Sequence, residues 1–169
     1  MAPTAALALI ASILAAAAPG GSAADARYTM GGMTADFSSM VMVDMAHIER
    51  LGTAVHTALL QAPRNPLTIQ GQVIAYSVLD TVIDCTARTM RAVAFTSYGP
   101  GDAVTVSGPA GGELQHLVPG STFDSAANVA CSGQARTPDA PILASRRLAA
   151  DYARMILRNA KERAVTPAV

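Results

Sequence analysis

The chain has 169 residues, of which 51% are hydrophobic and 4% aromatic, and it contains no tryptophan. Twelve basic and twelve acidic side chains give a formal net charge of zero. This length allows one domain with a single modest core. The positive mean hydropathy of +0.32 is no sign of a membrane protein, because an alanine-rich run at the N-terminus inflates it.

The first recognisable segment is this N-terminal run. Residues 5–18 are apolar except for Ser12, and residues 24–26 read Ala-Asp-Ala, which is a cleavage frame. The pattern predicts a secretory signal peptide over residues 1–26, followed by export to the periplasm or the extracellular space. The run is shorter than the roughly 20 residues that span a bilayer; an uncleaved anchor is the alternative. Because no cysteine lies near the cleavage frame, we expect no lipid anchor.

The next part of the chain favours short strands. We expect an extended segment over residues 28–39, a strand over 40–44 and a turn, or a single helical turn, over 47–52. Residues 53–61 alternate as in a second strand, although their alanine and leucine content leaves a helix as the competing interpretation. Two prolines within residues 62–71 predict a loop.

Further strands follow at short spacing. Residues 72–80 predict a third strand, and residues 82–98 form the longest alternating run, which places Cys85 on its mainly apolar face. Shorter strands are expected over residues 103–107 and 113–118, separated by glycine-rich turns. This succession predicts an antiparallel meander and an α+β fold.

Two helices complete the expected fold. Residues 122–130 predict a short helix with Ser121 or Thr122 as its N-cap. Residues 133–141 read as a linker, and residues 142–165 predict a long amphipathic helix. The apolar stripe of this long helix is expected to contain Ile142, Leu148, Ala149, Tyr152, Met155, Ile156 and Ala160.

The sequence holds two cysteines, Cys85 and Cys131. In an exported protein two cysteines most simply form one disulfide, which here would tie the short helix to the sheet. A loop of about 45 residues gives roughly 4 kcal/mol of stabilisation by chain-entropy arithmetic. A reactive thiol and an intermolecular bridge are the alternatives.

The C-terminal helix is the best candidate for a binding surface. Its charged face is expected to carry Arg147, Arg154, Arg158 and Lys161 together with Asp151. We interpret the four basic residues as a partner-binding site; a solvated face of a helix packed on the sheet is the alternative. Nucleic acid is not an expected partner, since this face has no aromatic side chains and the protein is expected to be exported.

No catalytic or metal site is expected. The three histidines, His47, His56 and His116, form no tight cluster in the sequence, although His47 follows Asp44 at helical-turn spacing and His56 might join it across a hairpin. There is neither a Gly-x-Ser-x-Gly elbow nor a phosphate-binding loop. We therefore expect no cofactor and no enzymatic activity.

Several short motifs follow one another along residues 28–132 in a characteristic order. They are Tyr28, Val43-Asp44, Asp84-Cys85-Thr86-Ala87-Arg88, Arg91, Tyr98-Gly99, Pro119-Gly120-Ser121 and Val129-Ala130-Cys131. In this order and spacing, residues 28–132 resemble the bacterial surface-adhesin protein E-like family. The resemblance implies a compact, mainly antiparallel sheet with its two cysteines bridged, in a Gram-negative exported protein. Family members described as adhesins bind host matrix or serum proteins.

These observations lead to two hypotheses about function. The first is an exported, non-enzymatic binding protein with a surface-adhesin E-like domain over residues 27–132, which engages a protein or an envelope partner. Its sheet edges could also pair with a second copy of the chain. The alternative is a structural subunit of an envelope assembly that docks through its C-terminal helix or its N-terminal segment.

Overall fold

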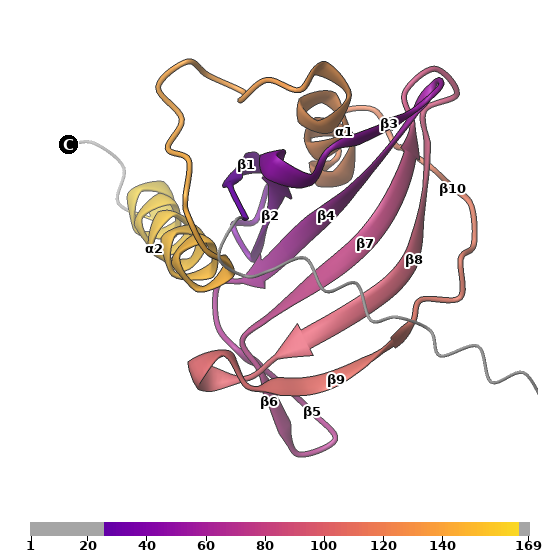
Figure 1. Ribbon diagram of the computed structural model, residues 1–169. Coiled ribbons are helices and arrows are strands. Elements are labelled where there is room, and N and C mark those ends of the chain that lie inside the picture. Colours follow the sequence, from indigo (N-terminus) through magenta and orange to yellow (C-terminus); the bar gives the residue numbers. More distant parts are fainter. Residues whose placement is uncertain (1–25, 166–169) are drawn as a thin grey trace, which may run out of the picture.

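The computed structural model describes residues 26–165, so the predicted signal peptide lies outside the described residues except for its last position. The protein is built on one antiparallel sheet with strands in the order β1-β2-β4-β7-β8-β10; β3 pairs with β4, and β9 with β8 (Figure 1). The strands of this sheet are β1 (Tyr28–Met33), β2 (Ser39–Asp44), β3 (Glu49–Leu51), β4 (Ala54–Pro63), β7 (Tyr76–Asp84), β8 (Thr89–Tyr98), β9 (Val104–Pro109) and β10 (Gln115–His116).

The remaining elements surround the sheet. A separate hairpin joins β5 (Leu67–Ile69) to β6 (Gln72–Ile74), and two 3-10 turns, η1 (Met45–His47) and η2 (Pro100–Asp102), lie between strands. The two helices are α1 (Thr122–Ser132) and α2 (Arg146–Val165). The α+β architecture expected from the sequence is confirmed.

The two helices cover opposite faces of the same half of the sheet. Along β2, Val41 and Val43 belong to the core beneath α1, whereas Met40 and Met42 belong to the core beneath α2. This division follows from the two-residue period of a strand, which points successive side chains to opposite faces. β2 is therefore buried on both sides, which explains its unbroken apolar sequence.

Helix α1 packs closely against β1 because glycine faces it. A Cβ placed on Gly31 would lie 2.8 Å from the Cβ of Ala126. The helix begins as predicted after Ser121, whose hydroxyl accepts a hydrogen bond from the backbone N–H of Asp124, and it ends at Gly133 in the left-handed conformation.

The predicted single strand over residues 82–98 is wrong. β7 ends at Asp84, and a tight turn leads into β8 at Thr89. The Asp84 carboxylate closes the turn by accepting the backbone N–H groups of Thr86 and Ala87 at 2.9 and 2.8 Å, and Arg88 takes a φ of 54°. Cys85 is thus the first residue of a turn rather than a strand residue on the apolar face.

That turn is attached to α1 at two points. A disulfide joins Cys85 to Cys131 near the end of the helix, with a Cα–Cα distance of 5.8 Å. The Arg88 guanidinium donates to the Asp124 carboxylate in the first turn of the helix. The Asp-Cys-x-x-Arg motif therefore fastens both ends of α1 to the hairpin between β7 and β8.

Other boundaries also differ from those expected. Residues 62–71 contain the end of β4 and all of β5, and residues 47–52 contain β3 after the 3-10 turn rather than a simple turn. The stretch 72–80 is divided between β6 and β7 at Ala75, whose N–H donates to the Tyr98 carbonyl. Residues 53–61 form β4, so the helical alternative is wrong there.

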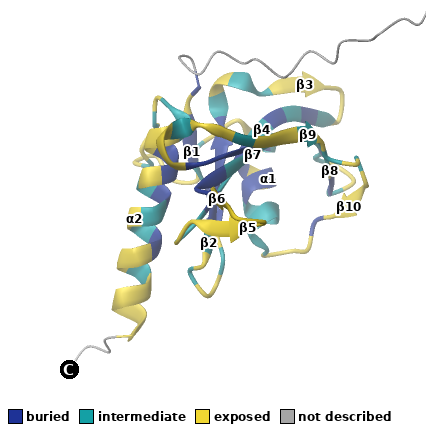
Figure 2. Ribbon diagram, turned by 90° about the horizontal axis from the view of Figure 1, so that it is seen from below, coloured by how far each residue is buried: buried dark blue, intermediate teal, exposed yellow. Residues whose placement is uncertain are grey.

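The C-terminal helix begins four residues later than predicted. Leu143 forms an antiparallel bridge with Tyr28, which holds the segment before Arg146 in an extended conformation. The buried face of α2 is also narrower than the predicted stripe. It consists of Ala149, Ala150, Ala153 and Leu157 and leaves Ile142, Leu148 and Met155 exposed (Figure 2).

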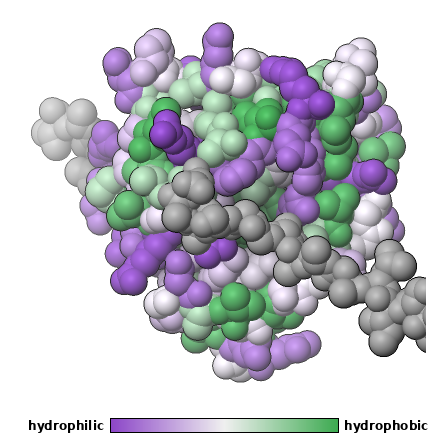
Figure 3. Space-filling view, in the orientation of Figure 1, coloured by the Kyte–Doolittle hydropathy of each residue, from purple (hydrophilic) through white to green (hydrophobic). Residues whose placement is uncertain are grey.

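Apolar side chains are also exposed at the end of the sheet that carries the β5–β6 hairpin. Figure 3 shows hydrophobic side chains gathered near the lower end of this view, where β6 lies against β9. The exposed residues of this region are Leu67, Ile69, Val73, Val104 and Val106. In the described part of the chain, no helix combines the length and apolar character needed to span a bilayer.

Candidate functional site

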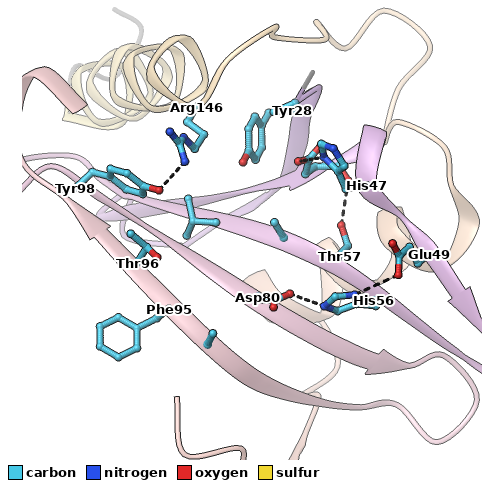
Figure 4. Close-up of a pocket in the computed structure, with 15 residues that line it drawn as sticks. Tyr28, His47, Glu49, His56, Thr57, Asp80, Phe95, Thr96, Tyr98 and Arg146 are labelled. Atoms are coloured by element: carbon cyan, nitrogen blue, oxygen red, sulfur yellow. Dashed lines mark hydrogen bonds and ion pairs between the residues drawn. The ribbon is translucent and has the colours of Figure 1, made fainter. Parts of the chain in front are cut away.

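A pocket opens on the face of the sheet that carries α2, beside the first residue of that helix (Figure 4). Its volume is about 220 Å³. Strands β1, β4, β7 and β8, the turn η1 and the residue Arg146 all contribute to its walls. Because these elements come from both ends of the chain, the pocket exists only in the folded protein.

One end of the pocket is built from stacked planar groups. The rings of Tyr76 and Tyr98 stack with their centroids 4.8 Å apart, and the Arg146 guanidinium lies over the Tyr98 ring at 4.5 Å. One guanidinium nitrogen, Nη1, also donates to the Tyr98 hydroxyl at 2.6 Å, and the Tyr76 hydroxyl donates to Asp102. Stacking and hydrogen bonding together fix the position of the Arg146 charge.

Tyr28 lies beside this stack and is 1% exposed. Its backbone pairs with Leu143 on one side and with Asp44 on the other, so the ring is held firmly in place. Burial, and next the negative charge of Asp44, raise the pKa of the Tyr28 hydroxyl, which therefore stays neutral and able to donate at physiological pH. In Figure 4 this hydroxyl points into the pocket.

The opposite end of the pocket is acidic. The Nε2 atom of His56 lies 2.5 Å from an Asp80 oxygen, and its Nδ1 atom lies 3.6 Å from a Glu49 oxygen. Both ring nitrogens thus face carboxylates. The His56 ring is thus held by Asp80 and faces the exposed Glu49, which makes this end of the pocket polar and rich in negative charge.

A second histidine–carboxylate pair lies at the rim. His47 Nδ1 is 2.8 Å from the buried carboxylate of Asp44, which also accepts the backbone N–H groups of Arg27 and Ala46. His56 lines the same pocket but contacts other carboxylates. Over residues 26–165, no three or more His, Cys, Asp and Glu side chains are arranged to hold a metal ion.

The predicted partner-binding residues of α2 fall into two environments. Arg147, Arg158 and Lys161 are exposed. Arg154 instead has a side chain only 17% exposed, and it donates to the Ala75 carbonyl at 3.2 Å and to Asp151 at 2.5 Å. Arg154 therefore joins the helix to the sheet, whereas the other three point to solvent.

Sequence reasoning missed the pocket. Tyr28 carries only a part of the family resemblance, and Arg146 is not among the four basic residues predicted to bind a partner. The available signal was the small number of tyrosines: the chain has four, and three of them, Tyr28, Tyr76 and Tyr98, gather at this end of the sheet.

Comparisons with known proteins extend over most of the domain. The sequence model of a family described as surface-adhesin protein E matches residues 29–132. Among solved structures, the crystal structure of protein E from non-typeable Haemophilus influenzae is similar, with a TM-score of 0.40 and 11% identity over 77% of this chain and 89% of that chain. No curated protein matches the chain.

Proposed function

Because this chain belongs to the surface-adhesin protein E family, we propose that it is an exported binding protein that engages a protein or cell-envelope partner and performs no catalysis. Membership of an adhesin family supports a binding role, and the Cys85–Cys131 disulfide supports an oxidising compartment. The predicted signal peptide points to the same periplasmic or extracellular location.

The observation that carries this proposal is the outer face of α2, which we define by Leu148, Met155, Arg158 and Lys161. Leu148 and Met155 are 54% and 48% exposed, and the two basic residues are also exposed. Apolar side chains next to cations on one solvent-facing helix are typical of a surface that a partner covers.

The charge of this face indicates the kind of partner. Within residues 26–165, no carboxylate lies within 4.0 Å of the Arg158 or Lys161 nitrogens, whereas Arg147 and Arg154 both face Asp151. Two uncompensated cations favour a partner that presents negative charge at this position. The helix itself is held firmly, since Leu157 and three alanines on its inner face are fully buried.

Site-specific photo-crosslinking in the native producer tests this proposal. A photoreactive residue at Asn159, on the exposed side of α2, should capture one defined partner, while the same residue at exposed Gln115 in β10 should not. The double charge reversal Arg158→Glu with Lys161→Glu should abolish the crosslink. Equal crosslinking from both positions, or a crosslink that survives charge reversal, would contradict a specific outer-face interaction.

The non-enzymatic part of the proposal has its own test. The purified protein should show no turnover of peptidoglycan or of peptide substrates. A measured activity that is abolished by one substitution in the pocket, such as His56→Gln, would refute it.

A structural role in an envelope assembly is the second candidate. The exposed Leu148 and Met155 favour it, because apolar residues on a helix often pack against a permanent neighbour. In that case gentle extraction of the native envelope should yield the protein in a complex of constant composition. Recovery as a free monomer would rule this candidate out.

A further inference from the structure

The pocket beside α2 has opposite charges at its two ends. Arg146 lies at one end and Glu49 and Asp80 lie at the other, while the buried Asp44 also lines the wall near Tyr28 (Figure 4). Between the two ends lies Val78 of β7, opposite Thr96 of β8, and Ala94 of β8 lies opposite Asp80 at the acidic end. A molecule bound here would therefore meet a positive charge, then an apolar surface, then negative charge.

Two hydrogen-bond donors at the positive end have no partner of their own. The Tyr28 hydroxyl points into the pocket and makes no hydrogen bond to another of the residues that the structure describes. The Nε atom of Arg146 is also buried, and it has no partner in the described part of the chain. Buried donors are almost always paired in folded proteins, so an acceptor from outside residues 26–165 is expected at the Arg146 Nε atom, and the Tyr28 hydroxyl is free to donate to the same molecule.

The charge balance shows what kind of acceptor fits. Among the described residues, no carboxylate lies within 4.0 Å of the Arg146 nitrogens. A guanidinium with an adjacent neutral hydroxyl binds an oxyanion well. The two carboxylates at the other end repel a second negative charge, which disfavours a dianion such as phosphate.

The geometry points to a binding site for a small apolar monocarboxylate, with its carboxylate on Arg146 and Tyr28 and its apolar body over Val78 and Ala94. The volume of about 220 Å³ suits a molecule of the size of a single hydrophobic amino acid. This site is separate from the outer face of α2. Its ligand and the macromolecular partner can therefore be tested independently, and failure of one leaves the other unaffected.

Calorimetric titration of the purified protein tests the ligand class. The probes are 3-phenylpropionate, hexanoate, the neutral isostere 3-phenylpropanamide and inorganic phosphate. Saturable one-to-one binding of at least one monocarboxylate is expected, with neither the amide nor phosphate binding. Binding of the amide as tightly as its acid, or no binding of either monocarboxylate at millimolar concentration, would overturn the inference.

Two pairs of variants locate the binding. Tyr28→Phe removes only the hydroxyl and should weaken carboxylate binding roughly tenfold or more, as expected for a lost hydrogen bond to a charged group. Tyr152→Phe is the matched control, because Tyr152 packs against the same core but does not line the pocket. Arg146→Gln should abolish binding, whereas Arg147→Gln, one residue along the helix and exposed, should leave it unchanged.

Thermal unfolding of each variant separates loss of the site from loss of the fold. A folded Tyr28→Phe protein that binds the carboxylate with unchanged affinity would overturn the assignment of the hydroxyl. Equal weakening by Tyr28→Phe and Tyr152→Phe would overturn the location of the site.

Discussion

The disulfide offers the sharpest test of how this fold is held together. It joins the turn after β7 to the last part of α1 across a sequence separation of 46 residues. Closing a loop of that length lowers the chain entropy of the unfolded state, which stabilises the folded protein by roughly 4 kcal/mol. Within a total stability of about 5–15 kcal/mol this is a large share. For a domain of this size, loss of the bridge should lower the melting temperature by on the order of 10 °C.

The perturbation is the paired substitution Cys85→Ala with Cys131→Ala. Thermal unfolding followed by circular dichroism should show this drop, and addition of a reductant should produce a similar drop in the unsubstituted protein but no further change in the variant. We expect the reduced protein to remain folded at room temperature, because the Arg88–Asp124 pair and the buried alanines of α1 also hold the helix.

One result would refute this reasoning. If the oxidised and fully reduced proteins unfold at the same temperature, the bridge contributes nothing to the stability of the fold. Thiol quantification under denaturing conditions must accompany the experiment, since it establishes that the bridge was reduced.

Three further predictions concern packing and charge. Gly31→Ala should lower the free energy of unfolding, measured by urea denaturation, by about 1–3 kcal/mol, because the added Cβ would meet the Cβ of Ala126 at 2.8 Å. Gly108→Ala is the control and should lower it far less, because its Cβ would meet only a ring carbon at 3.8 Å. Equal losses of stability in the two variants would contradict the close contact at Gly31. Leu157→Ala should lower the free energy of unfolding by about 2–5 kcal/mol in the same assay, since this side chain is fully buried between α2 and the sheet. A loss below about 1 kcal/mol would show that the helix is not firmly packed. The Gly120 N–H, and next the Arg88 guanidinium, lower the pKa of Asp124, so its contribution to stability is complete above its unfolded pKa of about 3.9 and is lost as the pH falls through its lower folded pKa. Asp124→Asn should therefore destabilise the protein at pH 7 and make a progressively smaller difference as the pH falls below about 3.9, and a difference that does not change with pH would contradict this linkage.

Strand positions with strong local patterns could be predicted from the sequence. The strand over residues 40–44 and the alternation over 53–61 both correspond to observed strands, β2 and β4. The turn between β7 and β8 could not, because it contains neither glycine nor proline. Its geometry comes from the Asp84 side chain and from the positive φ of Arg88, and neither interrupts the alternation of the sequence.

The candidate sites show a similar division. The basic helix was recognisable because its charges recur at helical spacing within one segment. Which of those charges remain free was not predictable, since Arg154 reaches back to a backbone carbonyl at the start of β7 only when the helix is packed on the sheet. The pocket left no local signal at all.

By itself, the sequence determined the strand-rich α+β class and the presence of two helices, because each of these depends on residue types and on periods within short segments. It favoured a bridge between the two cysteines, and the tertiary structure brings Cys85 and Cys131 together. The tertiary structure decided which side chains meet. Small residues such as Gly31 and Ala149 set how closely the two helices approach the sheet, and the bridge between Tyr28 and Leu143 sets where α2 begins. That starting point places Arg146 over Tyr98 and beside Tyr28, whose hydroxyl points into the pocket. The binding pocket is thus a consequence of packing between distant segments, which no local pattern encodes.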